Sequence, residues 1–341
     1  MENILPIKEV NKRNYTMDVL KAIFAICIVF THFPFPGEFG TVLSQIGISG
    51  VIFFLLISGY NSYDKDDKVA CSKLLKRFKR NGILTLIVLL MYLVFAIIER
   101  LITNDFDIFL NSFTNPWLFP RMIGYGDFEF IYGGPLWFLL ALLYSYLILY
   151  ILHRFKLIKY AFYFIPVLLL FRIFVENYVN TFNADWHLSA NFLAGALPIM
   201  LLGEYIKAKK NDFFKTPLYL NIILFVISTV FLFLGVYINV GDYNVAQVFK
   251  IISMLELFLI SLKLPGKKEV PLIGTLGRKY SLYIYVFHFM IGLTVYDLIY
   301  LFDWEIDYLM QIVALIFVIG ISILFYEVNN KLKLKIKSHR E

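Results

Sequence analysis

Repeated runs of about 20 mostly apolar residues constrain this chain more than any other feature. A transmembrane helix needs about that length, and strands would need alternating apolar and polar residues, which these runs lack. Backbone groups find no partners in lipid, so each run should be helical. The sequence predicts an all-α integral membrane protein, a bundle of about ten transmembrane helices at residues 17–36, 43–60, 82–101, 135–152, 160–178, 188–206, 216–238, 244–262, 280–301 and 308–328.

The positions of Lys and Arg support this count. If the N-terminus is cytoplasmic, all but five of the 32 basic residues fall in segments predicted to face the cytoplasm, as the positive-inside rule expects. Both termini are therefore predicted to be cytoplasmic. The net charge of +7 then reflects topology and contact with the lipid bilayer, and nucleic-acid binding is not expected.

Composition excludes several other classes of protein. A hydrophobic content of 60% is too high for intrinsic disorder or an ordinary soluble enzyme. Neither Cys27 nor Cys71 has a metal-ligand partner at a recognised spacing, and no metal is expected. We expect residues 1–341 to form a single transmembrane domain with short cytoplasmic tails, located in the cell membrane. A homo-oligomer is compatible with this expectation.

The first apolar run carries a polar stripe. On a helix, Lys21 lies about 20° and Asp18 about 40° from His32, so all three lie on one side, and the rise from Lys21 to His32 is about 16 Å. Ionisable residues inside a span are functional candidates. An imidazole can act as a general base, although a hydrogen bond between helices is the simpler interpretation of His32 alone.

A basic cluster precedes the third run, in the sequence SKLLKRFKRN. Leu74, Leu75 and Phe78 give it the apolar side of an interfacial helix. Arg77 and Arg80 share a face, and two guanidinium groups can bind phosphates by bidentate hydrogen bonds. The alternative is a topology anchor on anionic headgroups.

Polar and aromatic residues in later segments suggest further contacts. Tyr285 and His288 lie on one face of the ninth run, with interhelical packing as the alternative to binding. Arg172 and Glu176 are four residues apart and are interpreted as a structural pair. The four Trp residues fall at or beyond the predicted outer boundary, as an aromatic belt or as sugar-stacking platforms: Trp117, Trp137, Trp186 and Trp304.

Several of these segments together resemble the membrane acyltransferase 3 family. The resemblance is carried in order by MDVLKAIFAICIVFTH (17–32), FFLLISGY (53–60), RFKR (77–80), GPLWFLLALL (134–143), LGRKYSLYIYVFH (276–288) and FYEVNNKL (325–332). It covers nearly the whole chain. Lys21 stands where the family has Arg, which keeps the charge and loses the bidentate fork, and Asn329 stands where Pro is common.

The resemblance implies an enzyme, a membrane-bound O-acyltransferase that moves an acyl group, usually acetyl, from acyl-CoA to a hydroxyl, often on a glycan. His32 and Asp18 would be catalytic, His32 as base or acyl acceptor and Asp18 by orienting Lys21. Lys21, Arg77 and Arg80 would bind the CoA phosphates. Ser58, Trp137, Tyr285 and His288 would contact the acceptor, His288 by binding it or by stabilising the oxyanion. The main alternative is a transporter or exporter of a small molecule or glycan.

Overall fold

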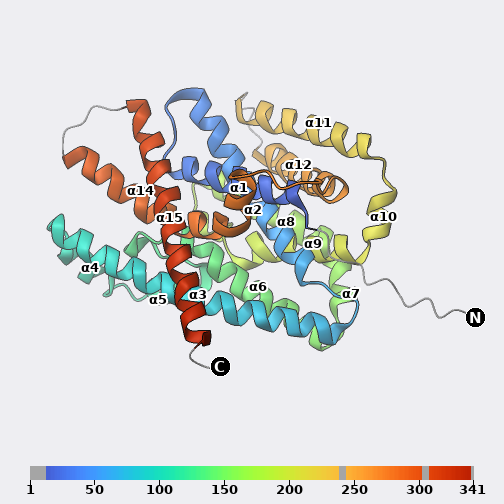
Figure 1. Cartoon of the computed structure of the whole chain (residues 1–341), viewed down its shortest axis with the longest axis horizontal. Helices are drawn as coiled ribbons and strands as arrows, with labels where there is room; N and C mark the ends of the chain where they lie inside the picture. Colours follow the sequence, from blue (N-terminus) through green and yellow to red (C-terminus); the bar gives the residue numbers. More distant parts are fainter. Residues whose placement is uncertain (1–12, 238–242, 302–306, 339–341) are drawn as a thin grey trace, which may run out of the picture.

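The computed structural model describes residues 13–237, 243–301 and 307–338, and every regular element within these ranges is helical (Figure 1). The longer helices are α1 (Tyr15–His32), α2 (Gly37–Ser62), α3 (Asp67–Ile102), α6 (Trp137–Arg154), α8 (Ile165–Phe182), α9 (Leu197–Ala208), α11 (Leu218–Tyr237), α12 (Tyr243–Lys263), α14 (Ser281–Leu301) and α15 (Asp307–Ser338). Shorter helices connect them: α4 (Phe106–Ser112), α5 (Leu118–Tyr125), α7 (Ile158–Ala161), α10 (Lys210–Lys215) and α13 (Ile273–Thr275). Single turns of 3₁₀ helix are η1 (Glu129–Ile131), η2 (Gly134–Leu136), η3 (Phe162–Phe164) and η4 (Trp186–Leu188), and π-helical turns are η5 (Phe192–Ala196) and η6 (Leu276–Tyr280).

The all-α fold class predicted from the sequence is confirmed. Among the described residues, 8 helical segments are long and apolar enough to cross a membrane: Tyr15–His32, Gly37–Ser62, Asp67–Ile102, Gly134–Arg154, Ile158–Phe182, Leu218–Val236, Ile273–Ile299 and Tyr308–Lys331. The other two predicted runs correspond to η5 with α9 and to α12, which contains Lys250 and Glu256. The count of ten spans and the cytoplasmic position of the termini stay predictions, and Trp304 lies outside the described residues.

Helix α1 ends at His32 rather than at residue 36, where the sequence placed the end of the first span. Pro34 and Pro36 follow, and the residue before a proline is disfavoured in helical conformation. At the other end, the side chain of Asn14 accepts a hydrogen bond of 2.8 Å from the Met17 N–H and caps the helix. A helix of 18 residues is about 27 Å long, so His32 lies close to one side of a bilayer core.

Helix α3 joins two segments that the sequence suggested were separate. The basic segment 72–81 and the third apolar run form one helix of 36 residues. The junction contains no proline, so nothing interrupts the backbone hydrogen bonds. The side chain of Asp66 caps the N-terminus by accepting from the Lys68 N–H at 2.8 Å.

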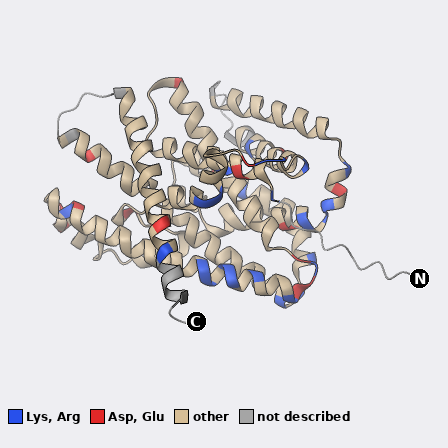
Figure 2. Ribbon diagram, viewed as in Figure 1, with Lys and Arg blue, Asp and Glu red and all other residues tan. Residues whose placement is uncertain are grey.

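Large apolar side chains are exposed along α3, α8, α11 and α15, as expected where helices face lipid. On α3 they include Ile83, Leu86, Leu90, Val94 and Ile98. Figure 2 shows much of the Lys and Arg on one side of the molecule, along the first half of α3 and around α10. The exposed apolar helices therefore indicate a multi-pass membrane protein.

The centre of the bundle is formed where α1 and α2 meet α9, α12 and α14 (Figure 1). Glycines allow this close approach. A Cβ atom on Gly59 of α2 would lie 2.0 Å from the carbonyl oxygen of Met200 on α9. A Cβ atom on Gly277 of η6 would lie 1.7 Å from the carbonyl oxygen of Asp18 on α1.

We expect Gly277→Ala to destabilise the protein, because the added methyl group collides with backbone that a side-chain rotation cannot move. The cost of overpacking is about 1–3 kcal/mol or more, which a thermal-unfolding curve in detergent would show as a lower Tm. Gly320→Ala on α15 is the matched control, since nothing lies within 4 Å of its Cβ position. Equal Tm values for the two variants would contradict the close contact between η6 and α1.

Candidate active site

The end of α1 brings His32 against α14. The ring centroids of His32 and His288 are 5.0 Å apart, and Phe289 meets His32 edge-on at 5.1 Å. His288 is fully buried, whereas the side chain of His32 is exposed. One imidazole is thus held in the core, and the other has an accessible surface beside it.

The hydrogen bonding of His288 defines its tautomer. Its Nδ1 lies 2.5 Å from the backbone carbonyl oxygen of Tyr285. A carbonyl oxygen only accepts, so Nδ1 carries the proton and donates. In the neutral ring Nε2 then has a free lone pair, and this buried atom has no hydrogen-bond partner among the described residues. Such an atom can accept a proton or a hydrogen bond from a bound hydroxyl.

Aromatic rings connect this pair of histidines to the start of α6. The Tyr285 ring lies 5.8 Å from His288 and 4.8 Å from Phe138, which contacts Trp137 at 6.0 Å. The Tyr285 hydroxyl donates to the carbonyl oxygen of Pro135 at 3.2 Å. Three elements that are far apart in sequence therefore place His32, His288, Tyr285 and Trp137 in one continuous group.

Ser58 does not join this group through any hydrogen bond of the described residues. It lies on α2, and its hydroxyl donates to the carbonyl oxygen of Phe54 in the preceding turn at 2.8 Å. Its position near the close contact between α2 and α9 at Gly59 gives it a packing role, and its predicted contact with substrate stays a prediction.

The opposite end of α1 holds the rest of the polar stripe. Buried Asp18 accepts from Lys21 Nζ at 2.7 Å and from Arg13 Nε at 2.8 Å. Arg13 also bonds both carboxylate oxygens of Glu269 at 3.0 Å. By helix rise Asp18 is about 21 Å from His32, so it positions Lys21 rather than touching reacting atoms.

Glu269 ties the loop before α13 to this end of α1. The hydrogen bonds from Arg13 lower the pKa of Glu269 to about 2, and Thr275 and Arg278 add to this effect. The carboxylate is therefore ionised at all ordinary pH values. Arg13 and Glu269 are residues that sequence reasoning missed, because nothing in the local pattern shows that residues 256 positions apart meet.

The paired arginines of α3 lie apart from Lys21. Arg77 donates through Nη2 to the carbonyl oxygen of Asn61 at the end of α2, at 3.2 Å. Arg80 is exposed, and Lys73 pairs with Asp64 at 2.7 Å. No hydrogen bond or ion pair of the described residues joins this cluster to the Asp18–Lys21 pair, so the two cationic groups are separate features.

A buried charged network near Arg77 was also missed. The imidazole of His153 lies between Asp67 Oδ1 at 2.8 Å and Glu204 Oε2 at 3.1 Å. Both His153 and Glu204 have fully buried side chains. The network links α3, α6 and α9. Glu204 lies inside the predicted span 188–206, so the rule that charges inside spans are functional could have identified it.

The predicted pair is present, with Arg172 Nη2 3.7 Å from Glu176 Oε2, and it belongs to a larger network than the sequence indicated. Lys250 of α12 also contacts Glu176, at 3.8 Å. Arg172 donates to the carbonyl oxygens of Ala194 and Gly195, which belong to the π-helical turn η5. These contacts fix α8 and α12 around an irregular turn whose carbonyls need donors in a membrane.

A bundle of apolar helices, with an accessible histidine at the end of α1 packed against a buried one on α14, defines an integral membrane protein with an enzyme-like site. The model of the acyltransferase 3 family, described as an acyltransferase domain, matches residues 14–327. The chain belongs to this family and is a membrane acyltransferase. A search of curated proteins and a search of solved structures found no significant match.

Proposed function

We propose that this protein is an O-acyltransferase of the cell membrane that moves an acyl group, in particular acetyl, from cytoplasmic acyl-CoA to a hydroxyl of a cell-surface or lipid-linked glycan. The observation that carries the proposal is the contact between accessible His32 and buried His288, whose Nε2 atom is unpartnered. Together with membership of the acyltransferase 3 family, this pair offers a base beside a position for a hydroxyl group.

The two cationic groups support a donor that enters from the cytoplasm. Arg77 and Arg80 lie on the segment of α3 that the charge pattern assigns to that side, and Lys21 lies on α1. Guanidinium groups suit phosphates. A pantetheine arm is comparable in length to the rise of about 16 Å from Lys21 to His32. The thioester could therefore reach His32 while the CoA phosphates stay at the cytoplasmic end of α1.

In the direct route, His32 takes the proton of the acceptor hydroxyl while the hydroxyl oxygen attacks the thioester carbonyl. A C–O bond forms, the C–S bond breaks, and the CoA thiolate takes the proton from His32. In the second route, a ring nitrogen of His32 attacks the thioester first, so that a C–N bond forms, the C–S bond breaks and CoA leaves as the thiolate. The acceptor hydroxyl then attacks this acyl group, so that a C–O bond forms, the C–N bond breaks and the hydroxyl proton balances the charge of the CoA thiolate. The net reaction is the same in both routes: the acyl group moves from the sulfur of CoA to the oxygen of the acceptor.

The tautomer of His288 determines whether this ring can donate or accept a hydrogen bond at the site. With Nδ1 donating to Tyr285, a neutral His288 has only an acceptor left, so it cannot donate to an oxyanion. It can accept a hydrogen bond from the acceptor hydroxyl and hold it beside His32. Trp137 is partly exposed and offers an aromatic ring to the apolar face of a sugar. Tyr285 is buried and packs beside His288.

Binding of CoA provides the first test. We expect CoA to raise the Tm of the purified protein, and we expect Arg77→Ala and Arg80→Ala each to weaken CoA binding by about tenfold to a hundredfold, as for loss of a charge-assisted hydrogen bond. Lys215→Ala is the matched control, because it removes an exposed cation that pairs with the neighbouring residue Asp212.

Absence of any effect of CoA on Tm would contradict the proposed donor. If the protein moved a small molecule or glycan across vesicles without consuming acyl-CoA, the exporter would be the better description. Mass spectrometry of surface glycans, with and without the gene, would identify the acceptor by the loss of an acyl increment.

A further inference from the structure

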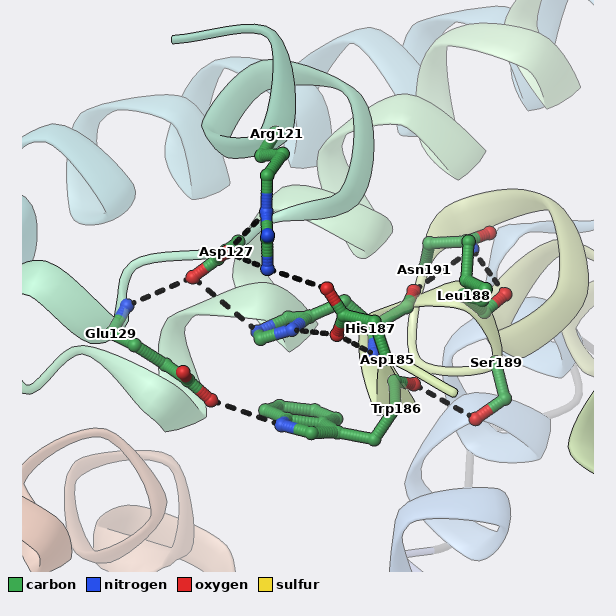
Figure 3. Close-up of polar contacts among 9 residues, drawn as sticks. All are labelled: Arg121, Asp127, Glu129, Asp185, Trp186, His187, Leu188, Ser189 and Asn191. Carbon is green, nitrogen blue, oxygen red and sulfur yellow. Dashed lines mark hydrogen bonds and ion pairs between the residues drawn. The ribbon is translucent and has the colours of Figure 1, made fainter. Parts of the chain in front are cut away.

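A second polar cluster lies where α5, the loop after it and the turn η4 meet. Figure 3 shows Arg121, Asp127, Asp185 and His187 directed toward one another. Asp127 and Asp185 are far apart in the sequence, and the fold alone brings them together. The cluster lies next to the start of α6, because a Cβ atom on Gly126 would be 3.0 Å from Cα of Trp137.

Arg121 neutralises part of the negative charge of the two carboxylates. Its Nη2 atom is 2.8 Å from Asp127 Oδ2 and 2.5 Å from Asp185 Oδ2. These contacts use the Oδ2 atoms only. Two carboxylates and one guanidinium leave a formal charge of −1. Glu129, whose N–H donates to Asp127 Oδ1 at 3.1 Å, adds another negative charge nearby.

His187 is a buried side chain with one unused nitrogen. Its exposed fraction is 1%. Nδ1 lies 2.7 Å from Asp185 Oδ1, and because a carboxylate accepts, Nδ1 carries the proton. Nε2 therefore presents a lone pair, and it has no hydrogen-bond partner among the described residues. Asp127 Oδ1 lies 3.8 Å from Nε2.

Two acceptors, one on an imidazole and one on a carboxylate, thus face each other with no donor between them. An electron-pair acceptor between Nε2 and Oδ1 would satisfy both atoms. Either a metal ion or a proton on His187 can fill this role.

The arrangement favours a metal ion. A histidine that binds a metal almost always donates its other ring N–H to a carboxylate or carbonyl oxygen, as His187 does to Asp185. One ligand atom from each of Asp127, Asp185 and His187 lies within 4.8 Å of the others. Zn²⁺ binds His nitrogen and Asp oxygen at about 2.0–2.2 Å, so an ion can contact both atoms across the 3.8 Å gap.

The chemistry of the ligands also selects the ion. Ca²⁺ and Mg²⁺ prefer oxygen ligands only, whereas an imidazole with carboxylates suits Zn²⁺. We propose that His187 Nε2 and Asp127 Oδ1 bind one Zn²⁺ ion at this surface, and that Asp185 orients the His187 ring through the hydrogen bond from Nδ1. The ion would join the loop after α5 to the turn before η5, and would hold the start of α6, with Trp137, in place.

Zinc binding to the purified full-length protein tests this proposal. The protein would carry an affinity tag without histidine, be treated with EDTA in detergent, and be dialysed against micromolar Zn²⁺. We expect one zinc per chain by elemental mass spectrometry and a higher Tm with zinc than with EDTA. Both measurements are independent of acyl transfer, so they also stand if the proposed function fails.

His187→Asn is the sharpest variant. Its side-chain amide keeps a donor at the position of Nδ1 and removes Nε2, so it separates the hydrogen bond to Asp185 from metal binding. We expect it, and Asp127→Asn, to weaken zinc binding by more than about tenfold. Asp105→Asn is the control, since it removes one negative charge from the same loop region outside the cluster.

Two results would overturn the proposal. One is the absence of stoichiometric zinc, or equal zinc binding by His187→Asn and the control. The other result has two parts. Zinc leaves the Tm of the wild type unchanged, and lowering the pH from 7.5 to 5.5 raises the Tm of the wild type but not that of His187→Asn. The second result would mean that His187 holds a proton toward Asp127 in place of a metal ion.

Discussion

His32→Ala should abolish acyl transfer while the protein stays folded. General-base catalysis contributes about 10²–10⁴-fold to a rate, and loss of an acyl-accepting nitrogen would cost at least as much. Because the side chain of His32 is exposed at the end of α1, its truncation leaves no buried cavity. The measurement is the rate at which the purified enzyme releases CoA from acetyl-CoA in the presence of a glycan acceptor.

Two controls make this result specific. The Tm of His32→Ala, and its rise on binding CoA, should match those of the wild type. Ile23→Ala, an exposed position on the same helix, should keep its activity. If His32→Ala retained more than about a tenth of the wild-type rate, His32 would be excluded as the base. Release of one equivalent of CoA without acceptor, lost in His32→Ala, would favour the acyl-enzyme route.

His288→Asn should lower the rate by about a hundredfold. The asparagine amide can still donate to the carbonyl oxygen of Tyr285, as Nδ1 does at 2.5 Å, but it has no atom at the position of Nε2. If Nε2 holds the acceptor hydroxyl, KM for the acceptor should rise and kcat should fall, while binding of CoA is unchanged. Acyl-transfer kinetics with varied acceptor concentration would measure both effects.

A structural role for His288 predicts a different result. If only its bond to Tyr285 mattered, His288→Asn would be active, and His288→Leu would lose stability and activity together. Tyr285→Phe provides a comparison, because it removes the hydroxyl that donates to Pro135 at 3.2 Å and leaves the His288 contact intact. A His288→Asn protein with normal kinetics would remove this residue from the acceptor site.

Much of the fold follows from local sequence. Runs of apolar residues predicted most of the long helices, because helix formation in lipid depends only on hydrogen bonds within each segment. The ends were less predictable. Proline residues end α1 at His32, and the continuity of α3 was hidden because its first half is charged and its second half apolar.

The site was predictable in part. His32, Tyr285 and His288 could be selected as candidates because the helical period places polar residues on one face of their own helix. Asp127, Asp185 and His187 were not expected to form a cluster, since two different loops supply them. The same holds for His153 and its contacts with Asp67 and Glu204.

The amino-acid sequence by itself determined the class of this protein, its helical segments, and the polar face of each helix, because these depend on interactions between residues a few positions apart. Only the tertiary structure decided which faces meet. Glycines such as Gly59 and Gly277 allow particular helices to approach closely, and that approach places His32 against His288. Contacts between distant residues are set by packing of the whole bundle, which no short stretch of sequence encodes.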